Sequence, residues 1–232
     1  MKTSWKFGVS ALCALLLAPI ASGQQDYIGR FDIFTGYTYL NSPLISLGES
    51  GFHTQVGTNP AKWYALGFDF SATAGDTVLL PSMLKASLQQ EIGAQLTMAG
   101  IPSSYVPKVP LHSRSQSYAT GPQLNYRHFK AVTLFIHPDL GAIHEAAIPH
   151  PTDPIGKLLV ASLAPSGVKT DWTYFYGVGG GMDINVTPHI GVRVHVDVVR
   201  DHLFSDLLNS RTSVRFSVGP AFHMGGNVAA KK

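Results

Sequence analysis

One face of every predicted β-strand in this chain is free of charge, and this feature most limits what the chain can fold into. Successive side chains of a strand point to opposite faces, so each alternating run divides into two registers. Eight runs alternate in this way, and their apolar registers contain no Asp, Glu, Lys or Arg. The runs are residues 31–39, 51–57, 64–72, 118–126, 132–142, 172–186, 190–199 and 212–222.

The opposite register of the same runs carries charge. A soluble ligand-binding barrel would reverse the pattern, with Lys and Glu outside and an apolar interior. A Lys or Arg facing hydrocarbon at the centre of a membrane costs roughly 2–4 kcal/mol, which explains why one face is uncharged. The pattern therefore favours a membrane barrel over a soluble barrel or a two-sheet sandwich, with a polar cluster in the lumen formed by Asp32, Asp69, Asp183, Arg193, Asp197 and Arg215.

The predicted fold is all-β, an eight-stranded antiparallel up-and-down transmembrane β-barrel. Its connections alternate between short turns (58–61, 127–130, 186–189) and long segments (41–50, 74–117, 143–171, 201–211), as the periplasmic turns and external loops of such barrels do. Aromatic residues gather near strand ends, where amphipathic rings suit a membrane interface. Three prolines lie inside predicted strands, where each removes a ladder donor, so we expect bulges or local ends of pairing at Pro122, Pro138 and Pro220.

The two longest connections each predict a short helix. Leu84, Leu88, Ile92 and Leu96 recur every four residues between Pro81 and Gly100 and mark one helical face. In the second segment, Asp153 and Pro154 form a typical helix start. These helices either pack their apolar faces on the barrel rim or present a surface to a partner.

The amino end predicts a secretory signal peptide, residues 1–23. Positive charge at Lys2 and Lys6 precedes an apolar run that ends in small residues at Ala21–Gly23. Residues 24–232 then form a single outer-membrane barrel domain. The one cysteine, Cys13, leaves with the signal, so we expect neither disulfides nor a thiol nucleophile.

Several segments resemble the outer membrane protein β-barrel domain family, whose shape is that of outer membrane protein A and the opacity proteins. The resembling segments are residues 32–40, 59–66, 118–123, 179–184, 190–193 and 215–222, which spread over most of residues 30–224. The resemblance implies a cell outer membrane location, both termini in the periplasm, outer-membrane lipid as surroundings and insertion by the barrel assembly machinery. A departure is the tail Gly225–Lys232, which follows the last aromatic residue of the final strand.

The sequence contains no recognisable catalytic or metal-binding motif. The ten histidines show no zinc-type helical spacing, so we expect no metal and no cofactor, although His144-Glu145 and His150 lie close together. No serine, histidine and acid are placed together by the sequence, so we expect no enzyme. The run Gly179–Gly181 lacks the features of a phosphate loop and is interpreted as close backbone packing.

We interpret the lumen charges as a closed, salt-bridged plug, because side chains nearly fill an eight-stranded barrel. Arg193 and Asp197, four residues apart on one strand, are the expected centre of this plug. The predicted function is an integral outer-membrane protein of structural or interaction type, expected to be a monomer without nucleic-acid partners. The alternatives are a narrow pore for small solutes and, less favoured, a lipid-modifying enzyme.

Overall fold

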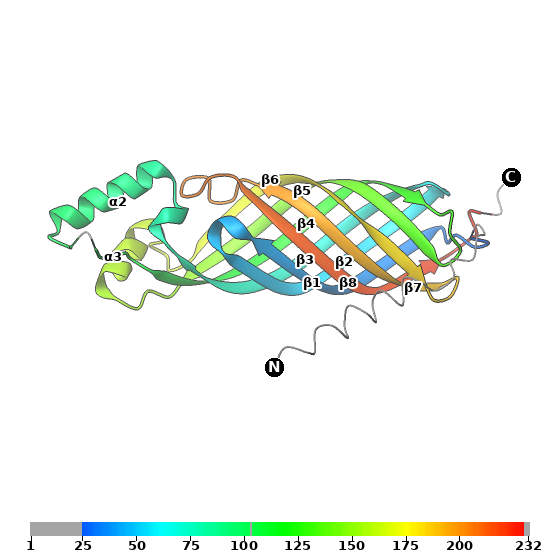
Figure 1. Cartoon of the computed structure of the whole chain (residues 1–232), viewed down its shortest axis with the longest axis horizontal. Helices are drawn as coiled ribbons and strands as arrows, with labels where there is room; N and C mark the ends of the chain where they lie inside the picture. The colour runs from blue at the N-terminus through cyan, green and yellow to red at the C-terminus, as the bar shows by residue number, and fades with distance from the viewer. Residues whose placement is uncertain (1–24, 103, 230–232) are drawn as a thin grey trace, which may run out of the picture.

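Eight antiparallel strands close into a barrel in the computed structural model of the chain, which describes residues 25–102 and 104–229 (Figure 1). Each strand pairs with its neighbours in sequence, and the first pairs with the last. The predicted fold class is therefore confirmed, including the second strand. The strands are β1 (Phe31–Ser42), β2 (Leu47–Ala61), β3 (Tyr64–Leu79), β4 (Val109–Tyr126), β5 (Val132–Pro149), β6 (Lys169–Asn185), β7 (Ile190–Asp201) and β8 (Arg211–Met224).

The two ends of the barrel differ. The terminal end holds the three short turns, the segment from Gln25 and the chain after Met224; the helical end holds the other connections (Figure 1). At the helical end lie the short turns η1 (Pro43–Ile45) and η2 (Pro81–Met83) and the helices α2 (Ala86–Met98) and α3 (Pro154–Leu163). No helix in residues 25–102 and 104–229 has the length and apolar character to cross a membrane. The predicted signal peptide lies outside the described residues.

Both predicted helices form, but α2 begins only at Ala86, so Leu84 precedes the helix instead of lying on its face. Asp153 Oδ1 accepts a hydrogen bond of 2.8 Å from the Gly156 amide, and Pro154 occupies the first turn of α3. On α2, Ile92 is buried in the same apolar cluster as Leu84 of the preceding segment, and Leu88 and Leu96 pack against it. The predicted helical face is therefore an inward-packing face.

The strands are longer than predicted at the helical end, so the expected long segments were wrong in extent. Residues 41–50 are mostly strand around η1, and β3, β4, β5 and β6 each continue well into the expected loops. The outward register of these extensions is polar, with Asp76, His112 and Arg114, so the apolar–polar alternation disappears although the strand continues. One turn is also displaced, because β2 ends only at Ala61.

The three prolines interrupt the sheet without shifting its register. The β4–β5 ladder lacks pairs around Pro122 and Pro138, and the β1–β8 ladder lacks pairs beside Pro220, while the pairing resumes in the same register on both sides. The expected bulges at these residues were wrong, and so were the expected ends of pairing, because each ladder loses a few pairs and then continues. The structure's register shift between β2 and β3 lies instead between Thr58 and Ala61.

Candidate functional site

The structure places all six residues of the predicted polar cluster inside the barrel. Each is at most 7% exposed. They do not form one cluster but follow one another in layers along the axis, each layer organised around one arginine. The charged side chains that are buried with them, and that the sequence analysis did not select, are Glu49, Asp139, Glu145, Asp201 and Arg211.

Arg193 organises the layer nearer the terminal end. Its Nε and Nη2 atoms donate to the two carboxylate oxygens of Asp183, at 2.6 and 2.8 Å, and its Nη1 donates to Gln55 Oε1. The guanidinium also lies over the rings of Phe34 and Phe135, with its carbon 5.7 and 4.8 Å from their centroids. This bidentate pair joins residues directly opposite each other on β6 and β7.

Arg215 and Arg211 organise the layers toward the helical end. Arg215 Nε donates to Asp197 Oδ2 at 2.7 Å. Arg211 donates to Asp201 at 3.1 Å and to Glu145 at 2.6 Å. The expected pairing of Arg193 with Asp197 was therefore wrong, because residues four apart on a strand lie about 13 Å apart while cross-strand neighbours meet.

Sequence reasoning missed the Arg211 layer because it assigned Glu145, Asp201 and Arg211 to loops. The signal was the odd or even position of each residue along its strand, which decides whether its side chain points inward. Asp201 continues the inward register of Asp197, and Arg211 continues that of Arg215. Extending each inward register past the end of the apolar face would have found all three residues.

The histidines lie in contact with aspartates. Among the described residues, four histidines are buried, and each has a ring nitrogen within 3.2 Å of an aspartate oxygen, in the pairs His53–Asp69, His137–Asp139, His195–Asp197 and His223–Asp32. His144 and Glu145, which the sequence places close together, point to opposite faces: Glu145 points inward to Arg211, while the His144 ring lies against Trp172 outside.

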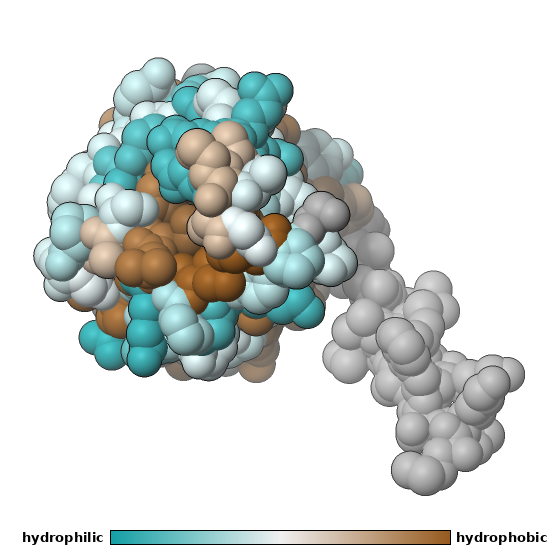
Figure 2. Space-filling model, turned by 90° about the vertical axis from the view of Figure 1, so that its left-hand side faces the viewer, coloured by the Kyte–Doolittle hydropathy of each residue, from teal (hydrophilic) through white to brown (hydrophobic). Residues whose placement is uncertain are grey.

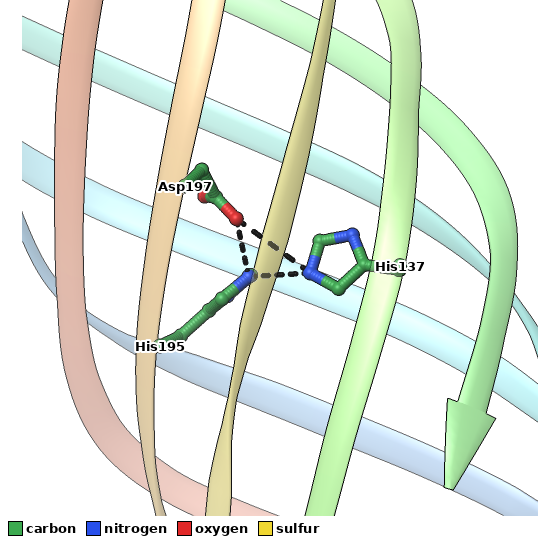
Figure 3. A group of neighbouring side chains, drawn as sticks. All are labelled: His137, His195 and Asp197. Atoms are coloured by element: carbon green, nitrogen blue, oxygen red, sulfur yellow. Dashed lines mark hydrogen bonds and ion pairs between the residues drawn. The ribbon is translucent and has the colours of Figure 1, made fainter.

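Two of these pairs meet in a cluster at the middle of the barrel. His137 of β5 and His195 and Asp197 of β7 point toward one another (Figure 3). The two Nε2 atoms are 2.7 Å apart, and Asp197 Oδ1 lies 2.6 Å from His195 Nε2 and 3.6 Å from His137 Nε2. Within the part of the chain that the structure describes, these three side chains are the group whose ligand atoms lie close enough together to hold a metal ion.

A serine, a histidine and an aspartate also meet in the lumen. His53 Nδ1 lies 3.0 Å from Ser217 Oγ, and its Nε2 lies 3.2 Å from Asp69 Oδ1. Ser217 is the cross-strand partner of His195, but its hydroxyl contacts the His53 ring. Hydrolysis requires a substrate at the serine, but Ser217 and His53 are both 0% exposed, and Ser217 is also bonded to Thr38.

Apolar residues cover the mouth of the lumen at the helical end, and the segment from Gln25 contacts the mouth at the terminal end. At the helical end, Leu203 and Phe204 of the β7–β8 connection turn inward. Phe204 has a φ of 52°, and its backbone amide donates a hydrogen bond to the Asp171 carboxylate. At the terminal end, Gln25 donates to Thr133 at 2.7 Å. The apolar residues that cover the helical end with them are Ile45, Leu47, Ile143, Phe175, Val199 and Leu208.

An apolar cavity lies above this layer, at the helical end. Figure 2, which views that end, shows apolar surface in a hollow at its centre. The lining comes from β3, β4, β5, α2, α3 and the connections around them, and its one charged member is Lys169 at the start of β6, which is hydrogen-bonded to Asp206 at 2.6 Å. Ala164, which follows α3, contributes to this lining.

The barrel has counterparts among solved structures. It matches the attachment invasion locus protein Ail of Yersinia pestis, solved with a heparin analogue, at 13% identity and a TM-score of 0.49, covering 84% of this chain and 98% of that one. It matches Neisserial surface protein A at 13% identity and a TM-score of 0.48, covering 84% of this chain and 96% of that one. It matches the outer membrane protein OprG of Pseudomonas aeruginosa at 11% identity and a TM-score of 0.47, covering 86% of this chain and 97% of that one.

No family model matches the sequence, and no curated protein matches it. At identities of 11–13% the structural similarity concerns the fold alone. That fold, a closed eight-stranded barrel, is the one implied by the resemblance to the outer membrane protein β-barrel domain family.

Proposed function

We propose that this chain is an integral outer-membrane barrel of structural or interaction type, without enzymatic activity, whose helical end faces the outside of the cell. The observation that carries the proposal is the outer face of the barrel. Among the described strand residues, the outward register carries charge only at Asp76, Arg114 and Arg200, all toward the helical end. Below them, large apolar side chains stand exposed around the barrel, such as Ile136 at 54% and Phe68 at 52%.

Water is a poor environment for such a surface. Soluble monomers rarely expose contiguous apolar patches larger than a few hundred Å², whereas this band runs around the whole barrel. Exposed Trp172 and Tyr174 toward the helical end and Tyr126 toward the terminal end fit the two aromatic girdles of membrane barrels. The short turns would then be periplasmic, as would both termini.

The filled lumen supports a structural or interaction role over a pore. Side chains of an eight-stranded barrel leave little room at the axis, and here paired charges occupy it and apolar residues cover the mouth at the helical end. We therefore expect no conductance steps when the purified protein is reconstituted in a planar bilayer at a protein-to-lipid ratio at which a porin control gives them. Defined, reproducible steps would contradict the closed barrel and favour the pore.

The apolar cavity favours a second function, the binding of an acyl chain at the helical end. We expect the substitution Ala164→Phe, which fills the cavity, to weaken binding of a fluorescent fatty acid at least ten-fold in lipid nanodiscs. Ala161→Phe, on the exposed side of the same helix, is the matched control and should bind as the unmodified protein does. Equal binding by all three proteins would exclude the cavity as a ligand site.

A further inference from the structure

We propose that His137, His195 and Asp197 bind one divalent transition-metal ion, best matched by zinc, in the middle of the barrel. Two imidazole nitrogens and one carboxylate oxygen form a common ligand set for zinc. The proposal concerns the interior of the barrel and is independent of what the helical end binds.

The three candidate ligand atoms lie close enough together to share one ion after a small adjustment. They form a triangle with sides of 2.7, 2.6 and 3.6 Å. Zinc lies about 2.0–2.2 Å from nitrogen and oxygen ligands, which separates the ligands of a tetrahedral site by about 3.3 Å. A small outward movement of His195 Nε2 would bring all three sides near that separation, with the fourth position left for water.

Hydrogen bonds alone do not account for the cluster. His137 Nδ1 contacts Asp139 Oδ1 at 2.8 Å and would donate to it, so the neutral ring presents a lone pair at Nε2. If His195 Nε2 carries a proton, it can serve only one of its two neighbours. If both Nε2 atoms carry protons, the 2.7 Å contact becomes a clash of two donors. One proton on His195 Nε2 leaves Asp197 Oδ1 without an aligned hydrogen bond, and two protons leave a contact between two donors. An ion bound by all three atoms would remove both problems.

Asp197 Oδ1 gives independent support. It is completely buried and, within residues 25–102 and 104–229, has no hydrogen-bond partner of acceptable geometry, although it points at both imidazoles (Figure 3). Its 2.6 Å contact with His195 Nε2 is not aligned as a hydrogen bond, and a buried carboxylate oxygen without a well-aligned donor is costly. Coordination of a cation would satisfy it.

The surrounding residues orient the ligands. Asp139 fixes the ring of His137, as carboxylates do for zinc-bound histidines. Arg215 Nε holds the other oxygen of Asp197 at 2.7 Å and leaves Oδ1 free. Its positive charge opposes a nearby cation, but the described interior contains eight buried carboxyl groups and only three buried arginines. A divalent ion would therefore reduce an excess of buried negative charge.

Gly179 of β6 provides the space for the cluster. A Cβ atom at this position would lie 1.9 Å from Asp197 Oδ1 and 2.7 Å from His137 Nε2. The predicted close packing at the Gly179–Gly181 run therefore has a specific cause here, since two inward side chains from β5 and β7 meet over this glycine.

The test refolds the purified protein in chelator-treated buffer with and without zinc, removes free metal and measures bound zinc by mass spectrometry. We expect one zinc per folded barrel, and at least a ten-fold loss for His195→Gln. His223→Gln removes a buried imidazole that contacts Asp32, outside the proposed site, so it is the matched control and should keep the metal. Asp139→Asn should weaken zinc affinity by about 10–100-fold through the orientation of His137.

Folding of each variant is checked by the gel shift between unheated and boiled samples. Because His195→Gln could fail to fold, cobalt is also added to the unmodified protein, whose visible spectrum should show the bands of a four-coordinate site. No bound metal in the folded protein, an octahedral cobalt spectrum, or equal zinc in the His195→Gln and unmodified barrels would overturn the proposal.

Discussion

Arg193→Met is expected to lower the free energy of unfolding by about 3–5 kcal/mol, the usual cost of removing one partner of a buried ion pair. The substitution leaves the carboxylate of Asp183, which is 1% exposed, without its two charge-assisted hydrogen bonds. The measurement is equilibrium unfolding by guanidinium of the protein folded in lipid vesicles.

The matched control is the double variant Arg193→Met, Asp183→Leu, which removes both charges together. It should recover most of the lost stability, because replacement of a whole buried pair by apolar residues is often close to neutral. A double variant as unstable as the single one would mean that Asp183 is compensated by groups other than Arg193.

Ile136→Arg is expected to destabilise the folded barrel by about 2–4 kcal/mol, the cost of an arginine facing hydrocarbon near the centre of a membrane. Ile136 points outward from the middle of the apolar part of β5 and is 54% exposed. In water, the same substitution at so exposed a site would change stability by at most about 0.5 kcal/mol. Unfolding from lipid vesicles measures the difference.

Thr170→Arg is the control for this experiment. Thr170 also points outward, but it lies at the helical end, beyond the uncharged band. Arginine there should cost little, because it meets water or lipid headgroups. If the two substitutions had the same small effect, the uncharged band would face water and the assignment to a membrane would be wrong.

The barrel could be predicted from sequence because one physical rule acts on every strand. A strand that separates hydrocarbon from a crowded lumen alternates in polarity along its length. The side chains of Val192 and Arg193 therefore show which face each residue occupies without knowledge of the neighbouring strands. The rule fails where the outer face becomes polar. Strands such as β4 then continue through Ser113 and Ser115 without a visible alternation.

The partners inside the lumen could not be predicted in the same way. The alternation along each strand shows that Asp197 and Arg215 point inward. Which side chains meet in the lumen depends on the register between strands. His137 and His195 are 58 residues apart in sequence, so no spacing motif joins them. Only the pairing of β5 and β7 with the intervening β6 brings them together over Gly179.

The position of two arginines on β8 has a consequence for how the barrel assembles. Arg211 and Arg215 neutralise Glu145, Asp201 and Asp197, which belong to β5 and β7. An intermediate that lacks the final strand would hold these acids without counter-charges, next to an open seam at β1. Chain closure and charge neutralisation are thus a single event, and a protein truncated before Arg211 should yield no smaller barrel, only an unclosed sheet left for proteases.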